Sequence, residues 1–427
     1  MSILAIKGGT PVRQRPFLEY NPFGDADRKA VLEVIDSGVL SGFVGSHCDE
    51  FFGGPKVRRL ETAWAEAHHV KHAVSSNSAT SSLVSALAAC KIGPGDEVIV
   101  TPFTMSATIT AILFNHAVPV FVDVEWETFN LDPAKIEAAI TPHTRAIMVV
   151  HLFGHPADMP AIMAIAKRHK LFVVEDNAQS LAATVDGRLA GTFGDIGVFS
   201  LNRHKLIQSG EGGIAVTDND ELALRLQLVR NHGENAATSF GLTDLSHTIG
   251  HNMRMTELEA AVAYEQFIRK DELIGGIVEM ATLLDRELGR LPGLAPVTIR
   301  PNCTHTRMHH TLIYDETVTG VPRDLLVKAL NAEGIPLWGG YLRPQYLLPA
   351  LQQQAVFGPT GCPLRCPHYK GQLQEWKEGL CPTAERLHQV MINHDLHRPP
   401  NTMADMADII AAFHKVAENM DELRSLV

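Results

Sequence analysis

The central part of the chain, from His72 to about Glu175, alternates between short apolar runs and longer segments with helical periodicity. The apolar runs predict strands at 73–74, 97–100, 118–122, 146–150 and 171–175. The periodic segments predict helices at 79–89, 105–115, 133–140 and 157–169. Strands that are apolar on both faces and alternate with helices form a mostly parallel sheet covered on both sides. The pattern therefore predicts a doubly wound α/β fold.

Segments on either side of this block predict further elements. Before it, helical spacing predicts helices at 26–38 and 57–67. After it, apolar residues from Glu257 to Leu291 repeat at helical spacing, over a length that could bridge two domains. Later residues predict a strand and two helices, at 311–314, 323–333 and 403–423. We expect three units: an N-terminal arm at 1–30, a large domain at 31–275 and a smaller C-terminal α/β domain at 276–427.

Composition excludes several classes of partner. The 427 residues are 45% hydrophobic and 20% charged, as in ordinary globular proteins. The net charge is −11 and no basic run is present, so a nucleic acid is not an expected partner. The apolar run Ile3–Ile6 is too short for a signal peptide or a membrane span. We expect a cytoplasmic protein without a membrane partner.

The six cysteines are widely scattered, which in a reducing compartment predicts free thiols. The residues that come nearest to a zinc pattern are Cys362, Cys366, His368 and Cys381. Because their spacing contains no CxxC pair, a proline-rich loop is favoured over a structural zinc site. We therefore expect no metal.

Polar turns follow several of the predicted strands, at the sheet edge where ligands bind in open α/β proteins. The strand at 73–74 is followed by the stretch Ser75–Ser82, which then opens a helix. Hydroxyl groups, backbone N–H groups and the positive end of the helix dipole in such a turn can hold a phosphate. Plain N-capping of the helix by serine or threonine explains the same residues equally well.

Two further strand ends carry ionisable groups. The strand at 171–174 runs into Glu175 and Asp176, where a carboxylate could pair with a cationic ring nitrogen or cap the next segment. A later strand runs into Ser200, and Lys205 follows five residues on, before a glycine-rich turn. An ordinary lysine has a pKa of about 10.4, so it becomes a nucleophile only where burial or a nearby cation lowers that pKa.

A phosphate site, a carboxylate for a ring nitrogen and an imine-forming lysine together are what pyridoxal phosphate requires. A dinucleotide-binding Rossmann motif is absent, because no GxGxxG sequence follows a predicted strand. The glycines at 210–213 lie between a loop and a strand, which is the wrong context for that motif. A P-loop motif is absent as well. The strand ends therefore favour a pyridoxal phosphate enzyme.

Several longer motifs agree with this interpretation. They are Ala5–Arg13, Ile92–Val100, Val150–Gly154, Glu175–Gln179, Phe199–Ser200 with Lys205, Gly210–Gly213 and Asn252–Met255. With these motifs the chain resembles the StrS/DegT group of sugar aminotransferases, which are pyridoxal phosphate enzymes of the aspartate-aminotransferase fold, fold type I. The resemblance is strongest up to about residue 290. It implies a large cofactor-binding domain, a smaller C-terminal α/β domain and a homodimer with shared active sites.

The resemblance also implies roles for individual residues. Lys205 corresponds to the catalytic lysine that forms the Schiff base with the cofactor and moves the proton. Asp176 corresponds to the partner of the pyridine nitrogen, and Gln179 to the residue near the ring hydroxyl. The phosphate grip corresponds to Ala79, Thr80 and Ser200, completed by Asn252 from the neighbouring subunit.

The chain departs from the family pattern at two of these positions. Met105 stands where the family usually has an aromatic residue that stacks on the cofactor ring, and its polarizable sulfur can still pack there. Ala79 stands where a glycine is usual in the phosphate turn. His204 precedes the lysine, and we interpret it as a residue of the pocket wall. The stretch Trp338–Arg343 could line the substrate entrance or simply pack as an aromatic turn.

We therefore expect an aminotransferase that moves an amino group from glutamate or glutamine to a ketone acceptor. The acceptor is a keto-sugar, nucleotide-linked or phosphorylated, or a keto-cyclitol, in the biosynthesis of amino sugars, antibiotics or surface polysaccharides. Two alternatives stay open. One is a pyridoxal phosphate-dependent sugar dehydratase or deaminase, which the presence of Lys205 disfavours. The other is a non-catalytic regulatory protein of the same fold, which has no need of a proton-moving lysine.

Overall fold

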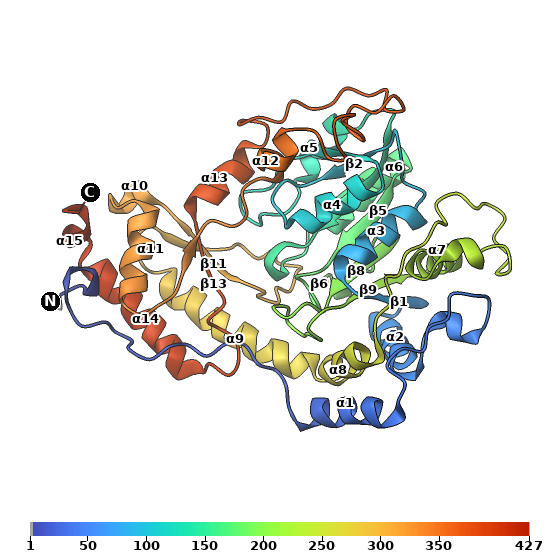
Figure 1. Cartoon of the computed structure of the whole chain (residues 1–427). Helices are drawn as coiled ribbons and strands as arrows, with labels where there is room; N and C mark the ends of the chain where they lie inside the picture. Colours follow the sequence, from blue (N-terminus) through green and yellow to red (C-terminus); the bar gives the residue numbers. More distant parts are fainter. Residues whose placement is uncertain (1–2, 427) are drawn as a thin grey trace.

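The computed structural model describes residues 3–426, and a seven-stranded sheet forms the centre of its larger lobe (Figure 1). The strand order is β1-β9-β8-β5-β4-β2-β3. All neighbours are parallel except β9, which runs antiparallel to both β1 and β8. The strands are β1 (His72–Ser76), β2 (Glu97–Val100), β3 (Val118–Phe121), β4 (Thr144–Val150), β5 (Phe172–Asp176), β8 (Ile196–Ser200) and β9 (Gly213–Thr217). The predicted mostly parallel sheet is confirmed.

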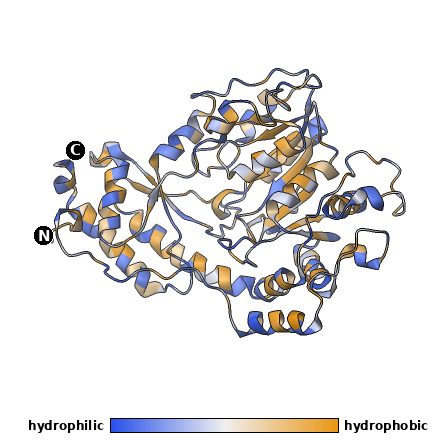
Figure 2. Cartoon of the chain, viewed as in Figure 1, coloured by the Kyte–Doolittle hydropathy of each residue, from blue (hydrophilic) through white to orange (hydrophobic). Residues whose placement is uncertain are grey.

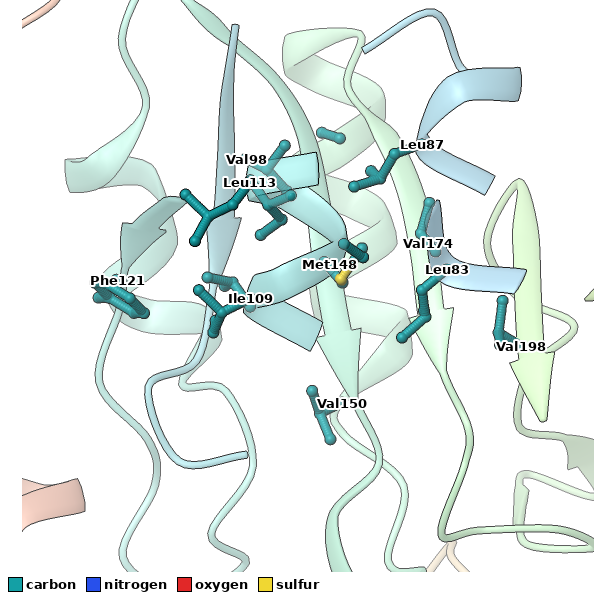
Figure 3. Close-up of a cluster of buried hydrophobic side chains, with 14 of the residues drawn as sticks. Leu83, Leu87, Val98, Ile109, Leu113, Phe121, Met148, Val150, Val174 and Val198 are labelled. Atoms are coloured by element: carbon teal, nitrogen blue, oxygen red, sulfur yellow. The ribbon is translucent and has the colours of Figure 1, made fainter. Parts of the chain in front are cut away.

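Helices cover both faces of this sheet. Because side chains alternate along a strand, Val98 and Val100 of β2 point to one face while Ile99 points to the other. The first face packs against α3 (Ala79–Ala89) and α4 (Ser106–Phe114), as Figure 3 shows. The second face packs against α5 (Pro133–Ala139) and α6 (Met159–His169). The strands of this sheet are apolar throughout because both of their faces are buried.

The edge of the sheet at β1, β8 and β9 is covered by helices that precede β1 and helices that follow β9 in the sequence. Trp64 of α2 stacks on Phe267 of α8, with ring centroids 4.2 Å apart, and both belong to one buried cluster with Phe199 and Ile214. The helices in this region are α1 (Asp25–Ser37), α2 (Pro55–His68), α7 (Asp220–Arg230) and α8 (Glu257–Phe267). The helices predicted at 26–38 and 57–67 are thus confirmed.

A second lobe is built on an antiparallel four-stranded sheet of order β10-β11-β13-β12. Its strands are β10 (Leu294–Pro296), β11 (His310–Tyr314), β12 (Trp338–Gly339) and β13 (Met391–His394). Its helices are α9 (Lys270–Leu288), α10 (Glu316–Thr319), α11 (Arg323–Ala332), α13 (Pro382–Val390), α14 (Met403–Glu418) and α15 (Met420–Arg424). The short helix α12 (Pro349–Gln352) instead packs through Leu351 on the core of the large lobe (Figure 1). The α/β character expected for the C-terminal part is confirmed.

The N-terminal arm packs on this second lobe, so both chain ends lie there (Figure 1). Leu4 is fully buried in its core. The carboxylate of Glu333 accepts hydrogen bonds from the backbone N–H groups of Ala5 (2.8 Å) and Val12 (3.1 Å). Arg13 pairs with Asp405 at 2.8 Å. The arm therefore ties the beginning of the chain to its end.

The helical periodicity was misleading at two places. The segment 257–291 forms two helices, because the helical conformation is interrupted between Phe267 and Lys270. Arg269 lies at this interruption and pairs with Asp27 of α1 at 2.7 Å. The last helix likewise ends at Glu418, before the short α15. Both breaks depend on contacts with distant residues or local capping that spacing does not reveal. The predicted domain boundary at 275–276 falls inside α9.

Several short elements carry too weak a pattern to be predicted. They are the hairpin β6 (Thr184–Val185) with β7 (Arg188–Leu189), and the 3-10 helices η1 (Ala5–Lys7), η2 (Asp49–Phe52), η3 (Leu152–Gly154), η4 (Gly233–Asn235) and η5 (Gln345–Leu347). Figure 2 shows hydrophobic residues along the strands of the large sheet and on the helices that pack against them. Within residues 3–426, no helix combines the length and the apolar run needed to cross a membrane.

Candidate active site

One cavity brings together the ends of β1, β5 and β8. Gly213 of β9 lies opposite Ser76 of β1 and opposite Ser200 of β8, so β9 joins the two strand ends. A Cβ atom at Gly213 would lie 2.5 Å from the backbone nitrogen of Ala79, and only glycine allows this approach. The cavity is lined by seven of the eight residues singled out from the sequence: Ala79, Thr80, Met105, Asp176, Gln179, Ser200 and Lys205.

The turn between β1 and α3 presents the N-terminal end of a helix to this cavity. Ser78 caps the helix, since its Oγ accepts a hydrogen bond from the backbone N–H of Ser81 at 3.1 Å. This cap satisfies only part of the free N–H groups of the first helical turn, so capping and a phosphate site are compatible in the same turn. Ala79 begins α3 in ordinary right-handed conformation, which explains why glycine is not required there.

The two acidic residues that end β5 face opposite ways. Glu175 is fully buried away from the cavity, where it accepts hydrogen bonds from His151 Nε2 at 2.8 Å and from the backbone N–H groups of Gly191 and Gly194. Asp176 faces the cavity. The alternation of side chains along a strand thus separates a structural carboxylate from one that can meet a ligand.

Asp176 is held by two hydrogen bonds. Its carboxylate accepts one from Thr108 Oγ1 at 2.8 Å and one from the backbone N–H of Ala178 at 3.2 Å. Burial raises the pKa of Asp176, while Thr108, Ala178 and the charge of Lys205 oppose that rise. A cation placed beside this carboxylate would gain a strong interaction. Sequence analysis missed Thr108, because a threonine inside a helix carries no signal of its own.

Lys205 stands on a loop that closes on itself after β8. The N–H of Leu201 donates to the Gly212 carbonyl at 2.9 Å, and the N–H of Arg203 donates to the Gly210 carbonyl at 2.9 Å. The lysine side chain is half-buried. Burial, together with the positive charge of Arg398, lowers its pKa to about 8, against the opposing charge of Asp176. A lysine with this pKa is partly neutral near pH 7 and can act as a nucleophile.

The opposite wall includes residues from the second lobe. Gln179 accepts a hydrogen bond from the backbone N–H of Phe153 at 2.9 Å and donates one to Tyr341 Oη at 3.1 Å. Burial raises the pKa of Tyr341 to about 12, so its hydroxyl stays protonated. Tyr341 belongs to the stretch Trp338–Arg343, and Trp338 lines an adjoining cavity. This stretch therefore contacts the cavity wall through Tyr341 and lines the adjoining cavity through Trp338.

Two of the residues singled out are exposed. Met105 is 51% exposed, and its Sδ accepts a hydrogen bond from the backbone N–H of Ala107 at 3.1 Å. Asn252 is exposed and does not line the cavity of its own chain. Its Oδ1 accepts a hydrogen bond from Arg254 Nε at 2.8 Å, and the carbonyl of the next residue, Met253, accepts one from Asn77 beside the phosphate turn.

Metal-ligating residues do not gather anywhere in residues 3–426, where no group of three or more could hold an ion. The six cysteines are free thiols in the structure.

Comparison with known proteins places the chain in one group. Residues 46–373 match the family described as the DegT/DnrJ/EryC1/StrS aminotransferase family. The chain is 34% identical over 436 residues to an L-glutamine:2-deoxy-scyllo-inosose aminotransferase of Micromonospora echinospora, covering 99% of this chain and 100% of the relative. It is 37% identical over 348 residues to a UDP-N-acetyl-3-dehydro-alpha-D-glucosamine 3-aminotransferase of Acidithiobacillus ferrooxidans, covering 79% and 88%.

A solved structure extends the likeness to three dimensions. The crystal structure of DesI in the presence of its TDP-sugar product superposes with a TM-score of 0.82 at 28% sequence identity, covering 99% of this chain and 98% of DesI. The fold expected from the sequence, fold type I, is confirmed.

Proposed function

The chain belongs to the DegT/DnrJ/EryC1/StrS aminotransferase family, and from that premise we propose that it transfers an amino group from L-glutamine or L-glutamate to a keto-cyclitol or keto-sugar. The observation that carries this proposal is the convergence of Lys205, Asp176 and the N-terminal end of α3 on one cavity. The two acceptor classes are those named for the relatives. The dehydratase and the regulatory alternatives are set aside, because the family consists of aminotransferases.

Members of the family use pyridoxal phosphate, and the residues of this cavity fit that cofactor. The turn that contains Ala79 and Thr80, together with Ser200, would hold the phosphate through N–H groups and hydroxyls. Asp176 would pair with the ring nitrogen, and Gln179 would lie near the ring hydroxyl. When bound, pyridoxal phosphate supplies an aldehyde for the amine and a ring that accepts electrons from the bond being broken.

The side chains then divide the remaining work. Lys205 Nζ, with its pKa of about 8, can take a proton from the amino-bearing carbon of the donor and return one to the acceptor carbon. Asp176 stays ionised beside a cation, because that pairing opposes the effect of burial on its pKa. Gln179 and Tyr341 are hydrogen-bonded to each other and close the wall of the cavity opposite. They limit access of water to the reacting carbon.

An absorption experiment tests the function. Purified protein should carry the visible absorption band of bound pyridoxal phosphate, and L-glutamine or L-glutamate should bleach it. Adding 2-deoxy-scyllo-inosose or UDP-N-acetyl-3-dehydro-α-D-glucosamine should restore the band. A Lys205→Ala variant should show an altered band and no bleaching. Protein that binds no pyridoxal phosphate, or whose band neither donor changes, would contradict the proposal.

The exposed position of Asn252 supports a homodimer in which the partner subunit's Asn252 completes the phosphate grip. Exposed apolar side chains lie near Asn252. The backbone of Asn252 pairs with Asn231, and Asn231 Nδ2 donates to the carbonyl of Val44 at 2.9 Å, which brings Val44 into this region. Val44 is 44% exposed and Ile249 is 73% exposed. Exposed apolar residues grouped around a polar one are typical of a subunit interface.

A mixing experiment tests the shared site. Lys205→Ala and Asn252→Ala subunits should each be inactive alone. Refolded together in equal amounts, they should regain about one quarter of the wild-type sites, because one of the two sites in each mixed dimer is intact. A mixture as inactive as its parents would show that Asn252 acts within its own subunit, and an Asn252→Ala variant that is fully active alone would show that Asn252 takes no part in the site.

A further inference from the structure

A second, larger cavity of about 790 Å³ adjoins the one that contains Lys205. His204 lines both cavities, so they share a wall. The second cavity is enclosed by the N-terminal arm, the loop of Lys205 and the second lobe, which contributes Trp338, Asp395 and Arg398. A substrate too large for the first cavity would extend past His204 into this one.

His309 and Asp395 form a hydrogen-bonded pair beside this cavity. Asp395 and Trp338 line the cavity, and His309 lies next to both of them with 13% of its side chain exposed. The strands β11 and β13 are paired with His310 opposite His394, so His309 and Asp395 extend that register by one residue toward the site. His309 Nδ1 lies within hydrogen-bond distance of Asp395 Oδ1. Burial opposes ionisation of Asp395, but His309 and Arg398 outweigh it and hold its pKa well below the ordinary value. The carboxylate is therefore ionised and can only accept.

This pairing fixes which nitrogen of His309 carries the proton. Because an ionised carboxylate has no hydrogen to give, Nδ1 must donate. The lone pair of Nε2 is then free whenever the ring carries a single proton. Within residues 3–426, His309 makes no other side-chain hydrogen bond. The ring is held from the sides by Phe153 and Trp338, which lie perpendicular to it at centroid distances of 5.2 and 6.0 Å. It presents an oriented hydrogen-bond acceptor.

The neighbours of His309 connect it to the reaction centre. Phe153 donates its backbone N–H to Gln179, which lines the Lys205 cavity. Arg398 is 2% exposed and donates Nη1 to the carbonyl of His204 at 2.7 Å. A ligand that places its reacting carbon at Lys205 would therefore bring its other groups to the His309 side of the site.

We propose that His309, oriented by Asp395, determines acceptor specificity by accepting a hydrogen bond from a hydroxyl group of the keto-sugar or keto-cyclitol. This inference rests on the proposed function. Hydroxyl groups beside the ketone are what such acceptors have and what the donor amino acid lacks. The α-carboxylate of glutamine or glutamate, which is attached to the reacting carbon, offers only lone pairs, which a neutral imidazole nitrogen cannot bind. His309 should therefore serve one half of the reaction and not the other.

The test measures the two half-reactions separately, by the absorption of the bound cofactor. L-glutamine is the donor probe, and 2-deoxy-scyllo-inosose and UDP-N-acetyl-3-dehydro-α-D-glucosamine are the acceptor probes. His309→Leu fills the space without a hydrogen-bonding atom, and we expect the donor rate to change by less than about threefold. The acceptor rate constant should fall about tenfold or more, the value of one oriented hydrogen bond.

Two further variants separate recognition from structural damage. His309→Gln keeps an amide that can accept a hydrogen bond, and it should recover part of the lost acceptor rate. Asp395→Asn frees the ring to adopt the other tautomer, and it should also impair the acceptor half alone. His414→Leu makes the same substitution at an exposed position of α14 and should leave both rates unchanged.

Equal losses in both half-reactions of His309→Leu, or no loss in either, would overturn the inference while the proposed function stands. A wild-type protein that neither L-glutamine nor L-glutamate bleaches, or that neither acceptor restores, would instead overturn the proposed function and this inference with it. The behaviour of the wild type therefore distinguishes the two failures.

Discussion

The two walls of the site hold their polar groups in different ways. On the large-lobe wall, the Asp176 carboxylate is fixed by hydrogen bonds from Thr108 and Ala178. In the second lobe, three histidines are fully buried: His310, His394 and His397. His310 and His394 face each other on β11 and β13, next to His309 and Asp395 in the sequence. The ring centroids of the three buried histidines are 4.6 to 6.0 Å apart. Each has one ring nitrogen without a hydrogen-bond partner in the part of the chain that the structure describes.

Each of these histidines makes one hydrogen bond that holds its ring in place. His310 lies 3.1 Å from Asp285 through Nε2, and His397 lies 2.8 Å from the Arg307 carbonyl through Nε2. His394 accepts a hydrogen bond at Nδ1 from the N–H of Leu396. Burial lowers the pKa of His397 to about 3 and that of His394 well below its ordinary value. The large-lobe wall thus places a carboxylate at the site, whereas the second-lobe wall is backed by His394 and His397, two buried rings that stay neutral at ordinary pH.

The largest effect expected from this difference is at Asp176. Asp176→Asn keeps the shape of the side chain but removes its charge, so the donor half-reaction should slow by about 10²–10³-fold. Thr108→Val removes one hydrogen bond and leaves the carboxylate in place, so the loss should be about tenfold at most. Single-turnover rates with L-glutamine measure both. A Thr108→Val loss as large as that of Asp176→Asn would show that the hydrogen bond, and not the charge, is what matters.

The pH dependence of the Thr108→Val variant sharpens this test. The hydrogen bond from Thr108 lowers the pKa of Asp176, so its removal raises that pKa. A carboxylate with a higher pKa takes up a proton at a higher pH when the solution is acidified. The acid limb of the rate profile should therefore move to higher pH in Thr108→Val, and an unmoved limb would contradict the account.

The buried histidines predict a smaller effect, on stability rather than rate. An unfolded histidine takes up a proton near pH 6.5, whereas folded His397 does so only near pH 3. Between these values the unfolded chain binds more protons, so stability is complete above about pH 6.5 and falls as the pH falls. Each histidine whose pKa is lowered to this extent should reduce the free energy of unfolding by about 1.4 kcal/mol per pH unit, or by about 2 kcal/mol between pH 6.5 and 5.

His397→Gln tests this dependence, since an amide can still donate to the Arg307 carbonyl but does not titrate. The thermal unfolding midpoint of this variant should fall less between pH 7 and 5 than that of the wild type. His414→Gln, at an exposed site on α14, should behave like the wild type. If His397→Gln loses as much stability as the wild type over that range, acid sensitivity has its source outside this cluster.

The contrast between the walls also explains what could be predicted from the sequence. On the large-lobe wall each functional side chain lies within a few residues of a strand end, so strand pattern and motif together indicated Asp176, Ser200 and Lys205. The parallel sheet was predictable because its strands are continuous apolar runs. The break at Arg269 was not, because it depends on a pairing with Asp27, more than two hundred residues away.

The second-lobe wall could not be predicted in the same way. His309 and Asp395 are 86 residues apart and meet only because β11 and β13 pair in a particular register. The strand β13 follows a long segment of loops and short helices and has no distinctive pattern. Tyr341 was included only as part of an aromatic stretch. Groups that depend on long-range register stay hidden from local analysis, even where they face the site.

Met105 gives the smallest expected effect and tests whether the whole large-lobe wall is as firmly held as Asp176. It lines the cavity, yet it is 51% exposed and is fixed only by the hydrogen bond from Ala107 to its sulfur. Met105→Ala should weaken pyridoxal phosphate binding by about three- to tenfold, whereas Met105→Phe should stay within about threefold of the wild type. Titration of the cofactor-free protein with pyridoxal phosphate measures both.

Phe114→Ala, which removes a 60% exposed side chain at the far end of α4, is the matched control. Unchanged affinity in Met105→Ala would mean that another residue covers the ring, and that this wall is defined by its buried members alone.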